Sequence, residues 1–199
     1  MHRGVSTATC QDLPVDELAA DLAAYQAEDV AREASAGTDP GQLHPGLLPL
    51  VWLLGRWRGE GVAAGSPGEP DLPVTLEAEW SHAGAPTLAY TARTLVGDRV
   101  LAEERGFWRQ RPGGDVEVVL THASGVLEML VGTPARTRLE LASDLIARTA
   151  SAPADTASTR LYGLVEGRLL YAVDVASDGQ PLRSRVSGAL DRLPGHAES

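Results

Sequence analysis

The sequence contains no lysine and no asparagine, so all 17 of its basic residues are arginine. Without lysine, the chain has no amine for a Schiff base and no ammonium group for a phosphate-binding loop. The 27 acidic residues outnumber the arginines and give a net charge of −10, which disfavours binding to a bare nucleic-acid backbone. Lysine-dependent catalysis is therefore excluded, and we expect no nucleic-acid partner.

Cysteine and long apolar runs are equally scarce. The single cysteine, Cys10, permits no internal disulfide and is typical of a reducing compartment. The longest apolar stretch, residues 47–54, is interrupted by Pro49 and is far shorter than the roughly 20 residues that a membrane span requires. The first residues lack the apolar core of a secretory signal. We therefore expect a cytoplasmic protein with no membrane partner.

The N-terminal part of the chain differs in composition from the rest. Residues 1–43 hold eight acidic and two basic residues, and Leu18, Leu22 and Tyr25 recur at helical spacing within the alanine-rich stretch 16–34. The breaker-rich residues 35–41 are typical of a linker. The pattern predicts an acidic, helical or partly disordered extension over 1–42, a domain over 43–193 and a tail over 194–199. An alternative role for the extension is recruitment of a partner.

From residue 44 onward the sequence alternates between apolar and polar residues, which is typical of half-buried strands. The alternation is clearest in 74–82, 115–122, 138–145 and 168–175, and Gly- and Pro-containing turns separate the runs. Helical periodicity is missing from 55–179, which disfavours parallel βαβ folds. The pattern indicates an all-β, antiparallel fold, either a sandwich or an up-and-down barrel, and about ten strands in this length favour a closed barrel with room for one small ligand.

One expected strand has an unusual glycine pattern. Gly55, Trp57, Gly59 and Gly61 would project to one face, and charged residues between them to the other. Inward glycines let a ligand or another backbone approach closely. The motif therefore predicts either part of a ligand-cavity wall or a bent strand with a core tryptophan, and the pattern leaves both open.

Several motifs occur in the order found in the nitrobindin family, which this chain resembles. Residues 55–61 resemble the family's G-x-W-x-G-x-G, residues 81–91 its S-H-x-G-x-P…A-Y-T, and residues 106–112 its G-(Y/F)-x-R-x-R-P. The resemblance covers about residues 43–193. It implies a ten-stranded antiparallel barrel, similar in architecture to fatty-acid-binding proteins, that holds a ferric b-type haem through a histidine near the C-terminus. It also implies isomerisation of peroxynitrite to nitrate and binding of nitric oxide.

Residue 185 departs from this family pattern. The family's P-L-x-x-H segment, which carries the haem-ligating histidine, ends here in Arg185, and Ala102 stands where some relatives have a second histidine. A guanidinium stays protonated and offers no lone pair to iron. We therefore expect no cofactor, and the family's haem b in particular is not expected. Enzymatic activity is not favoured, because the family's activity depends on haem. The barrel would instead bind another small hydrophobic or amphipathic ligand, whose carboxylate could pair with Arg183 or Arg185.

Two histidines leave a haem protein open as the alternative. His82 and His122 each end an apolar strand face, so both are candidate cavity residues, although either could be a hydrogen-bonded barrel residue instead. His122 is the better candidate for iron, and with it the chain would be a ferric-haem protein with peroxynitrite isomerase or nitric oxide-binding activity. No separate metal site and no catalytic set is predicted, since adjacent Glu103 and Glu104 point to opposite faces of a strand.

Overall fold

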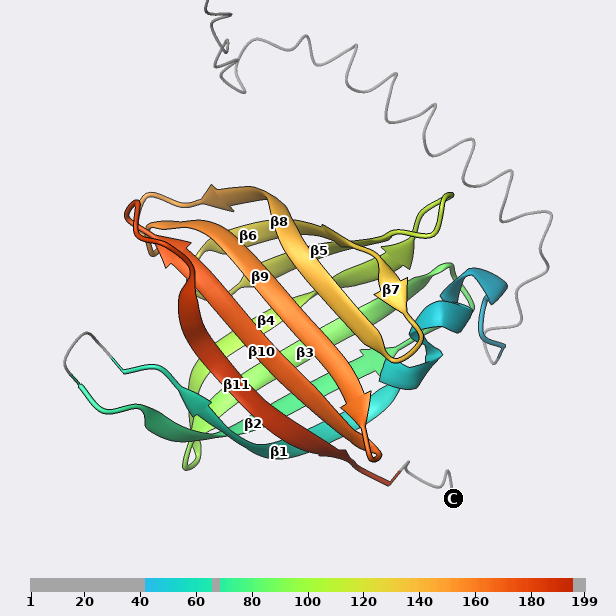
Figure 1. Ribbon diagram of the computed structural model, residues 1–199, viewed down its shortest axis with the longest axis horizontal. Coiled ribbons are helices and arrows are strands. Elements are labelled where there is room, and N and C mark those ends of the chain that lie inside the picture. The colour runs from blue at the N-terminus through green and yellow to red at the C-terminus, as the bar shows by residue number, and fades with distance from the viewer. Residues whose placement is uncertain (1–41, 66–68, 195–199) are drawn as a thin grey trace, which may run out of the picture. The chain divides into compact units, whose positions relative to one another are not determined.

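The computed structural model describes residues 42–65 and 69–194 (Figure 1). The predicted extension over 1–42, including its expected helix and Cys10, lies outside the described residues except for residue 42. Among the described residues, no helix combines the length and apolar character needed to cross a membrane.

A short 3-10 helix and a series of β-strands make up the described chain. The elements are η1 (Pro45–Leu53), β1 (Gly55–Ala63), β2 (Leu72–Ser81), β3 (Thr87–Val96), β4 (Arg99–Gln110), β5 (Val116–His122), β6 (Val126–Gly132), β7 (Pro134–Ala135), β8 (Arg138–Arg148), β9 (Asp155–Val165), β10 (Arg168–Ser177) and β11 (Arg183–Arg192). The alternating runs of the sequence correspond to β2, β5, β8 and β10. The strand predictions at these positions are therefore confirmed.

The strands form one antiparallel sheet that closes on itself. The order of neighbours is β6-β5-β4-β3-β2-β1-β11-β10-β9-β8-β7, and β6 also pairs with β8. The ten longer strands thus complete a barrel, and the two-residue β7 adds only a short pairing with β8. The prediction of a ten-stranded, up-and-down antiparallel barrel is confirmed.

The barrel interior is filled unevenly along its axis. The helix η1 lies at the end where the chain enters β1 (Figure 1). Its Leu47, Leu50 and Leu53 are fully buried and join the core. An aromatic cluster packs between the walls, with ring centroids 4.7 to 5.8 Å apart, and consists of Trp80, Tyr90, Trp108, Tyr162 and Tyr171. The interior beside η1 is therefore a packed core.

The glycines of β1 allow close approach of β11. A Cβ atom added to Gly59 would lie 2.1 Å from the carbonyl oxygen of Ala189, closer than any real contact. Trp57, on the same strand face, is buried, and its Nε1 donates a hydrogen bond of 2.7 Å to the carbonyl of Leu53. The guanidinium of Arg192 lies 4.1 Å from the Trp57 ring centroid. The glycines of β1 thus allow the backbone of β11 to lie close to β1.

Candidate functional site

A cavity of about 430 Å³ lies inside the barrel, away from η1. Its lining comes from β1 to β6 and from β9 to β11, and it extends from the barrel end opposite η1 to the aromatic cluster, of which Trp80, Tyr90 and Tyr171 are lining residues. Much of the wall is apolar, with Leu76, Leu101, Val173, Val175 and Val186 among the lining residues. The volume falls within the range of about 300–1,000 Å³ that is typical of small-molecule sites.

Charged or titratable side chains from four strands meet on one wall of this cavity: Glu104 of β4, His122 of β5, Glu128 of β6 and Arg160 of β9. Nη1 and Nη2 of Arg160 donate hydrogen bonds of 2.8 Å to the two carboxylate oxygens of Glu104. Nη2 also donates to Oε2 of Glu128 at 2.5 Å. The hydroxyl of Tyr90 donates to Oε1 of Glu104 at 2.7 Å. We call the four charged or titratable residues the buried ionic cluster.

The alternation of the strands explains why these charges face inward. Glu128 lies between the buried Val126 and Leu130 on β6, at a position where an apolar residue would be expected. Glu104 and His122 are register partners on β4 and β5, so their side chains emerge next to each other. Charges that point into an apolar interior must be paired, and Arg160 pairs with both carboxylates.

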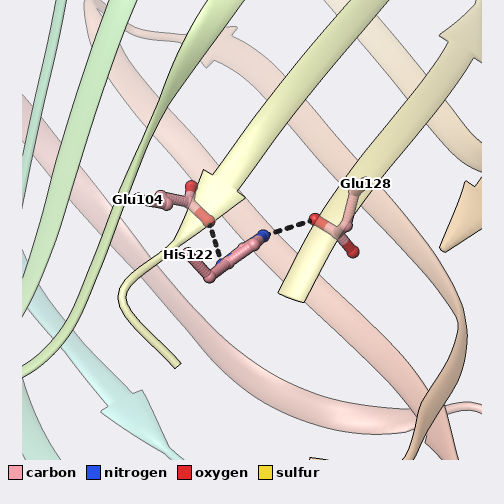
Figure 2. Close-up of side chains that lie close together, drawn as sticks. All are labelled: Glu104, His122 and Glu128. Carbon is pink, nitrogen blue, oxygen red and sulfur yellow. Dashed lines mark hydrogen bonds and ion pairs between the residues drawn. The ribbon is translucent and has the colours of Figure 1, made fainter. Parts of the chain in front are cut away.

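His122 lies between the two carboxylates (Figure 2). Its Nε2 is 3.0 Å from Oε2 of Glu128, which is hydrogen-bond distance. Its Nδ1 is 3.5 Å from Oε2 of Glu104, a longer contact without hydrogen-bond geometry. Glu128 therefore holds one ring nitrogen firmly, and the other is held less tightly.

The ionisation of the cluster is set by competition between burial and opposite charge. Burial raises the pKa of the Glu104 carboxyl, but the Arg160 guanidinium and its hydrogen bonds outweigh burial and lower it. Burial likewise opposes ionisation of Glu128, yet the hydrogen bond with His122 and the charge of Arg160 lower its pKa to about 2. Burial and the Glu104 charge together raise the pKa of Tyr90. Both carboxyls are thus ionised at neutral pH, and Tyr90 remains a hydrogen-bond donor.

The same residues also have the spacing of a small cation site. One donor atom from each of Glu104, His122 and Glu128 lies within 4.8 Å of the others. Arg160 already occupies both carboxylates and supplies a positive charge there, which would repel a divalent ion. We therefore interpret the cluster as an ionic network of the cavity wall.

Five residues named from the sequence line the cavity: Ala102, Glu103, Glu104, His122 and Arg185. The Arg185 side chain is half exposed, and its Nη2 lies 3.1 Å from Oδ1 of Asp155. Asp155 in turn accepts a hydrogen bond from the Ser177 hydroxyl, which fixes the carboxylate at the cavity mouth. Residue 185 is therefore placed where its side chain can reach a bound molecule.

The other residues singled out from the sequence lie elsewhere. Nδ1 of His82 accepts a hydrogen bond of 3.4 Å from the backbone nitrogen of Gly84, within the turn after β2. Neither His82 nor the motif residues Gly55, Trp57, Gly59 and Gly61 are among the described residues that line the cavity. His44 caps the start of η1 through a 3.1 Å hydrogen bond from Gly46.

Of the cluster, only His122 was predicted from the sequence as a cavity residue. Glu104 was named only as part of an unsuitable catalytic pair with Glu103, and Glu128 and Arg160 were not identified. The available signal was a charged residue at an inward position of an alternating strand. That signal indicates a buried ion pair, but it does not identify the partner. Arg160 lies 56 residues from Glu104 and 32 from Glu128, and only closure of the barrel brings them together.

Known proteins resemble this chain in sequence and structure. The model of a family described as a THAP4-like, heme-binding beta-barrel domain matches residues 46–192. A ferric nitrobindin-like protein of Kineococcus radiotolerans is 43% identical over 168 residues, which cover 74% of this chain and 93% of the relative. A peroxynitrite isomerase of Frankia casuarinae is 41% identical over 174 residues, covering 80% of this chain and 92% of the relative. The crystal structure of Rv2717c from M. tuberculosis matches with a TM-score of 0.71 at 34% identity, covering 77% of this chain and 100% of that one.

These similarities correct one expectation. The arginine at position 185 led to the expectation of no cofactor, whereas the matching family is described as heme-binding and relatives are named peroxynitrite isomerase. The expectation of no cofactor is therefore wrong, and the comparisons point to haem. The physical reason is that residue 185 decides a single bond to iron, whereas the cavity wall meets most of the surface of a bound molecule.

Proposed function

Because the chain belongs to the nitrobindin family of haem-binding β-barrels, we propose that its cavity binds ferric haem and that His122 supplies the iron ligand in place of residue 185. One observation carries the proposal. Of the described histidines, His122 is the one that lines the cavity. Arg185 lines the same cavity but has no lone pair for iron.

The cavity has residues suited to both parts of a haem. Its apolar wall suits the porphyrin ring, and the imidazole of His122 suits ferric iron. A histidine that binds a metal commonly donates its other ring N–H to a carboxylate, which fixes the tautomer and the ring orientation. Glu128 would accept the hydrogen bond from Nε2 of His122. Nδ1 makes the longer contact, with Glu104, and would be the nitrogen that binds iron.

The activity that this supports is isomerisation of peroxynitrite, for which several relatives are named. When bound, ferric haem would supply the iron at which peroxynitrite rearranges to nitrate. The rearrangement conserves atoms and charge, so the chain need supply neither a proton nor a leaving group. The role of Arg160 and Glu128 would be to hold His122, and that of the apolar wall would be to limit access of water.

Titration with ferric haem tests this proposal. We expect saturable binding with a shifted Soret band, and at least a tenfold loss of affinity in His122→Gln, because glutamine cannot replace imidazole at iron. His82→Gln is the matched control, since His82 does not line the cavity. If His122→Gln binds haem with the affinity and spectrum of the wild type, His122 is not the ligand. With haem bound, the wild type and His82→Gln should convert peroxynitrite to nitrate in higher yield than His122→Gln.

Arg185 favours a second candidate ligand for the cavity, an amphipathic carboxylate. Its guanidinium lies at the cavity mouth, oriented by Asp155, where it could bind the carboxylate of an amphipathic molecule whose apolar body lies inside. Displacement of a fluorescent probe by a fatty acid and by the fatty alcohol of equal length tests this role. Arg185→Gln should weaken binding of the acid and leave binding of the alcohol unchanged. Arg183→Gln, which changes an exposed arginine that does not line the cavity, should affect neither.

A further inference from the structure

Tyr90 connects the aromatic cluster to the buried ionic cluster. Its side chain is buried and lines the cavity, and its hydroxyl donates a hydrogen bond of 2.7 Å to Oε1 of Glu104. Its ring centroid lies 4.7 Å from that of Trp80, which also lines the cavity, and 5.5 Å from that of Trp108. A phenol in this position combines an oxidisable ring with an acceptor for its proton.

One-electron oxidation of a tyrosine requires such an acceptor, because a phenol that has lost an electron is a strong acid and must release its proton. Burial and the Glu104 charge raise the pKa of Tyr90, so the phenol is protonated before it reacts. The Glu104 carboxyl is ionised, since Arg160 holds its pKa low, and it can therefore take the proton. Arg160 also pairs with Glu128, so a protonated Glu104 does not leave the guanidinium without a counter-charge.

The other four rings of the aromatic cluster lack this arrangement. The indole N–H groups of Trp80 and Trp108 are buried without a hydrogen-bond partner. The Tyr162 hydroxyl lies beside Arg160, whose guanidinium is already protonated and can accept no proton. In the part of the chain that the structure describes, the Tyr171 hydroxyl has no hydrogen bond to a carboxylate. Loss of an electron together with a proton is therefore favoured at the ring that has the carboxylate partner.

We propose that this chain reduces nitrogen dioxide to nitrite, with Tyr90 as the electron donor and Glu104 as the proton acceptor. Nitrogen dioxide is a small, uncharged radical suited to the apolar wall of the cavity, and it forms with a hydroxyl radical when the O–O bond of peroxynitrous acid breaks. One electron passes from the phenol to nitrogen dioxide, which leaves as nitrite. The phenolic O–H bond breaks as its proton moves to Oε1 of Glu104. The products are nitrite, a phenoxyl radical and a neutral carboxyl group, so atoms and charge balance.

A one-electron reductant such as ascorbate completes the cycle. Ascorbate returns an electron to the phenoxyl radical, Glu104 returns the proton, and the oxidised ascorbate loses a proton to water. This activity goes beyond the proposed isomerisation, which transfers no electron to or from the side chains. It needs no haem, so a failure of haem binding and a failure of this reduction are separate results.

Pulse radiolysis of the full chain in nitrite solution, without added haem, tests the electron donor. The radiolysis supplies nitrogen dioxide, and the near-ultraviolet absorption of the phenoxyl radical measures the reaction. All chains carry Tyr25→Phe, so that only Tyr90, Tyr162 and Tyr171 can give the signal. We expect a phenoxyl radical in this parent chain and at least a tenfold lower yield in Tyr90→Phe. Tyr162→Phe, which removes a buried phenol that does not line the cavity, should react as the parent does.

The proton acceptor is tested by substitution and by solvent. Glu104→Gln keeps a hydrogen-bond acceptor beside Tyr90 but cannot take the proton, so phenoxyl formation should slow at least tenfold. Glu103→Gln is the matched control, because Glu103 also pairs with arginines but does not contact the phenol. In the parent chain, heavy water should slow the reaction about twofold, because a proton moves with the electron. Circular dichroism and a thermal melt establish that each variant is folded.

Three results would overturn the proposal: no phenoxyl radical in the parent chain, an equal yield in Tyr90→Phe, or an unchanged rate in Glu104→Gln or in heavy water. Mass spectrometry of the unsubstituted chain adds a measurement that needs no variant. Without a reductant, a second nitrogen dioxide adds to the phenoxyl ring, so nitration should mark Tyr90 in preference to Tyr162 and Tyr171. Equal nitration of the three would contradict the assignment to Tyr90.

Discussion

At the scale of single residues, the cavity depends on which side chains offer lone pairs and which offer protons. Arg185 and His122 both line it, and they have opposite capacities, since a guanidinium only donates and a neutral imidazole can also accept or ligate. Arg160 holds two carboxylates, one of which hydrogen-bonds to His122. A change at any of these positions therefore alters the chemistry of the cavity more than its shape.

Arg185→His should tighten the binding of ferric haem. The variant places an imidazole on the cavity lining at the position where the nitrobindin resemblance implies the iron ligand, and imidazole has the lone pair that guanidinium lacks. We expect at least a tenfold gain in affinity in a Soret titration. Arg183→His is the control, because Arg183 does not line the cavity. An equal gain in both variants would mean that any added surface histidine suffices.

Glu128→Gln should destabilise the chain at neutral pH and have less effect in acid. The folded state lowers the pKa of Glu128 to about 2, whereas an unfolded glutamate titrates near about 4.3. The stabilisation is therefore present above about pH 4.3 and is lost as the pH falls toward 2; it corresponds to about 3 kcal/mol. Urea unfolding of the haem-free chain at pH 7, 4 and 3 measures it.

The exposed pair of Glu140 and Arg138 supplies the control for that experiment. Glu140→Gln also removes a carboxylate with an arginine partner, but the side chain is 66% exposed. An exposed pair is screened by water and contributes little. If Glu140→Gln and Glu128→Gln changed the free energy of unfolding equally at neutral pH, burial would not be the source of the effect.

At the scale of elements, the sequence was enough to predict the strands but not the contacts between strands that are distant in the sequence. The alternation in 74–82 and 168–175 predicted β2 and β10, because one face of each strand is apolar. The pairing of Arg160 with Glu104 was not predictable, since it depends on the curvature and closure of the whole sheet. Likewise, the inward glycines of β1 indicated a close approach, but only the pairing of β1 with β11 identifies the approaching backbone as that of Ala189.

Gly59→Ala should therefore weaken the contact of β1 with β11. The added Cβ would lie 2.1 Å from the carbonyl oxygen of Ala189 and within 3 Å of the Leu190 Cα, so backbone must shift. We expect a loss of about 2–3 kcal/mol in the free energy of unfolding, measured by urea titration. Gly163→Ala on β9 is the control, because its added Cβ would meet nothing within 4 Å. Similar losses in the two variants would show that strand propensity, and not the close approach, sets the effect.

At the scale of the whole molecule, binding in the cavity is linked to the stability of the barrel. The cavity is lined by residues from β1 to β6 and from β9 to β11, so unfolding would destroy the site completely. A ligand that binds only the folded chain stabilises it by an amount set by its concentration relative to its dissociation constant. At a free haem concentration 100 times the dissociation constant, the free energy of unfolding should rise by about 3 kcal/mol.

Thermal or urea unfolding of the full chain at several haem concentrations measures this linkage. At one fixed haem concentration, the rise should be largest in Arg185→His, intermediate in the wild type and smallest in His122→Gln, because the dissociation constants are expected to increase in that order. His82→Gln should follow the wild type. Haem could saturate in the Soret titration and yet leave the free energy of unfolding unchanged. Haem would then bind the folded and the unfolded chain equally well. The cavity would then not be the haem site, whichever residue binds the iron.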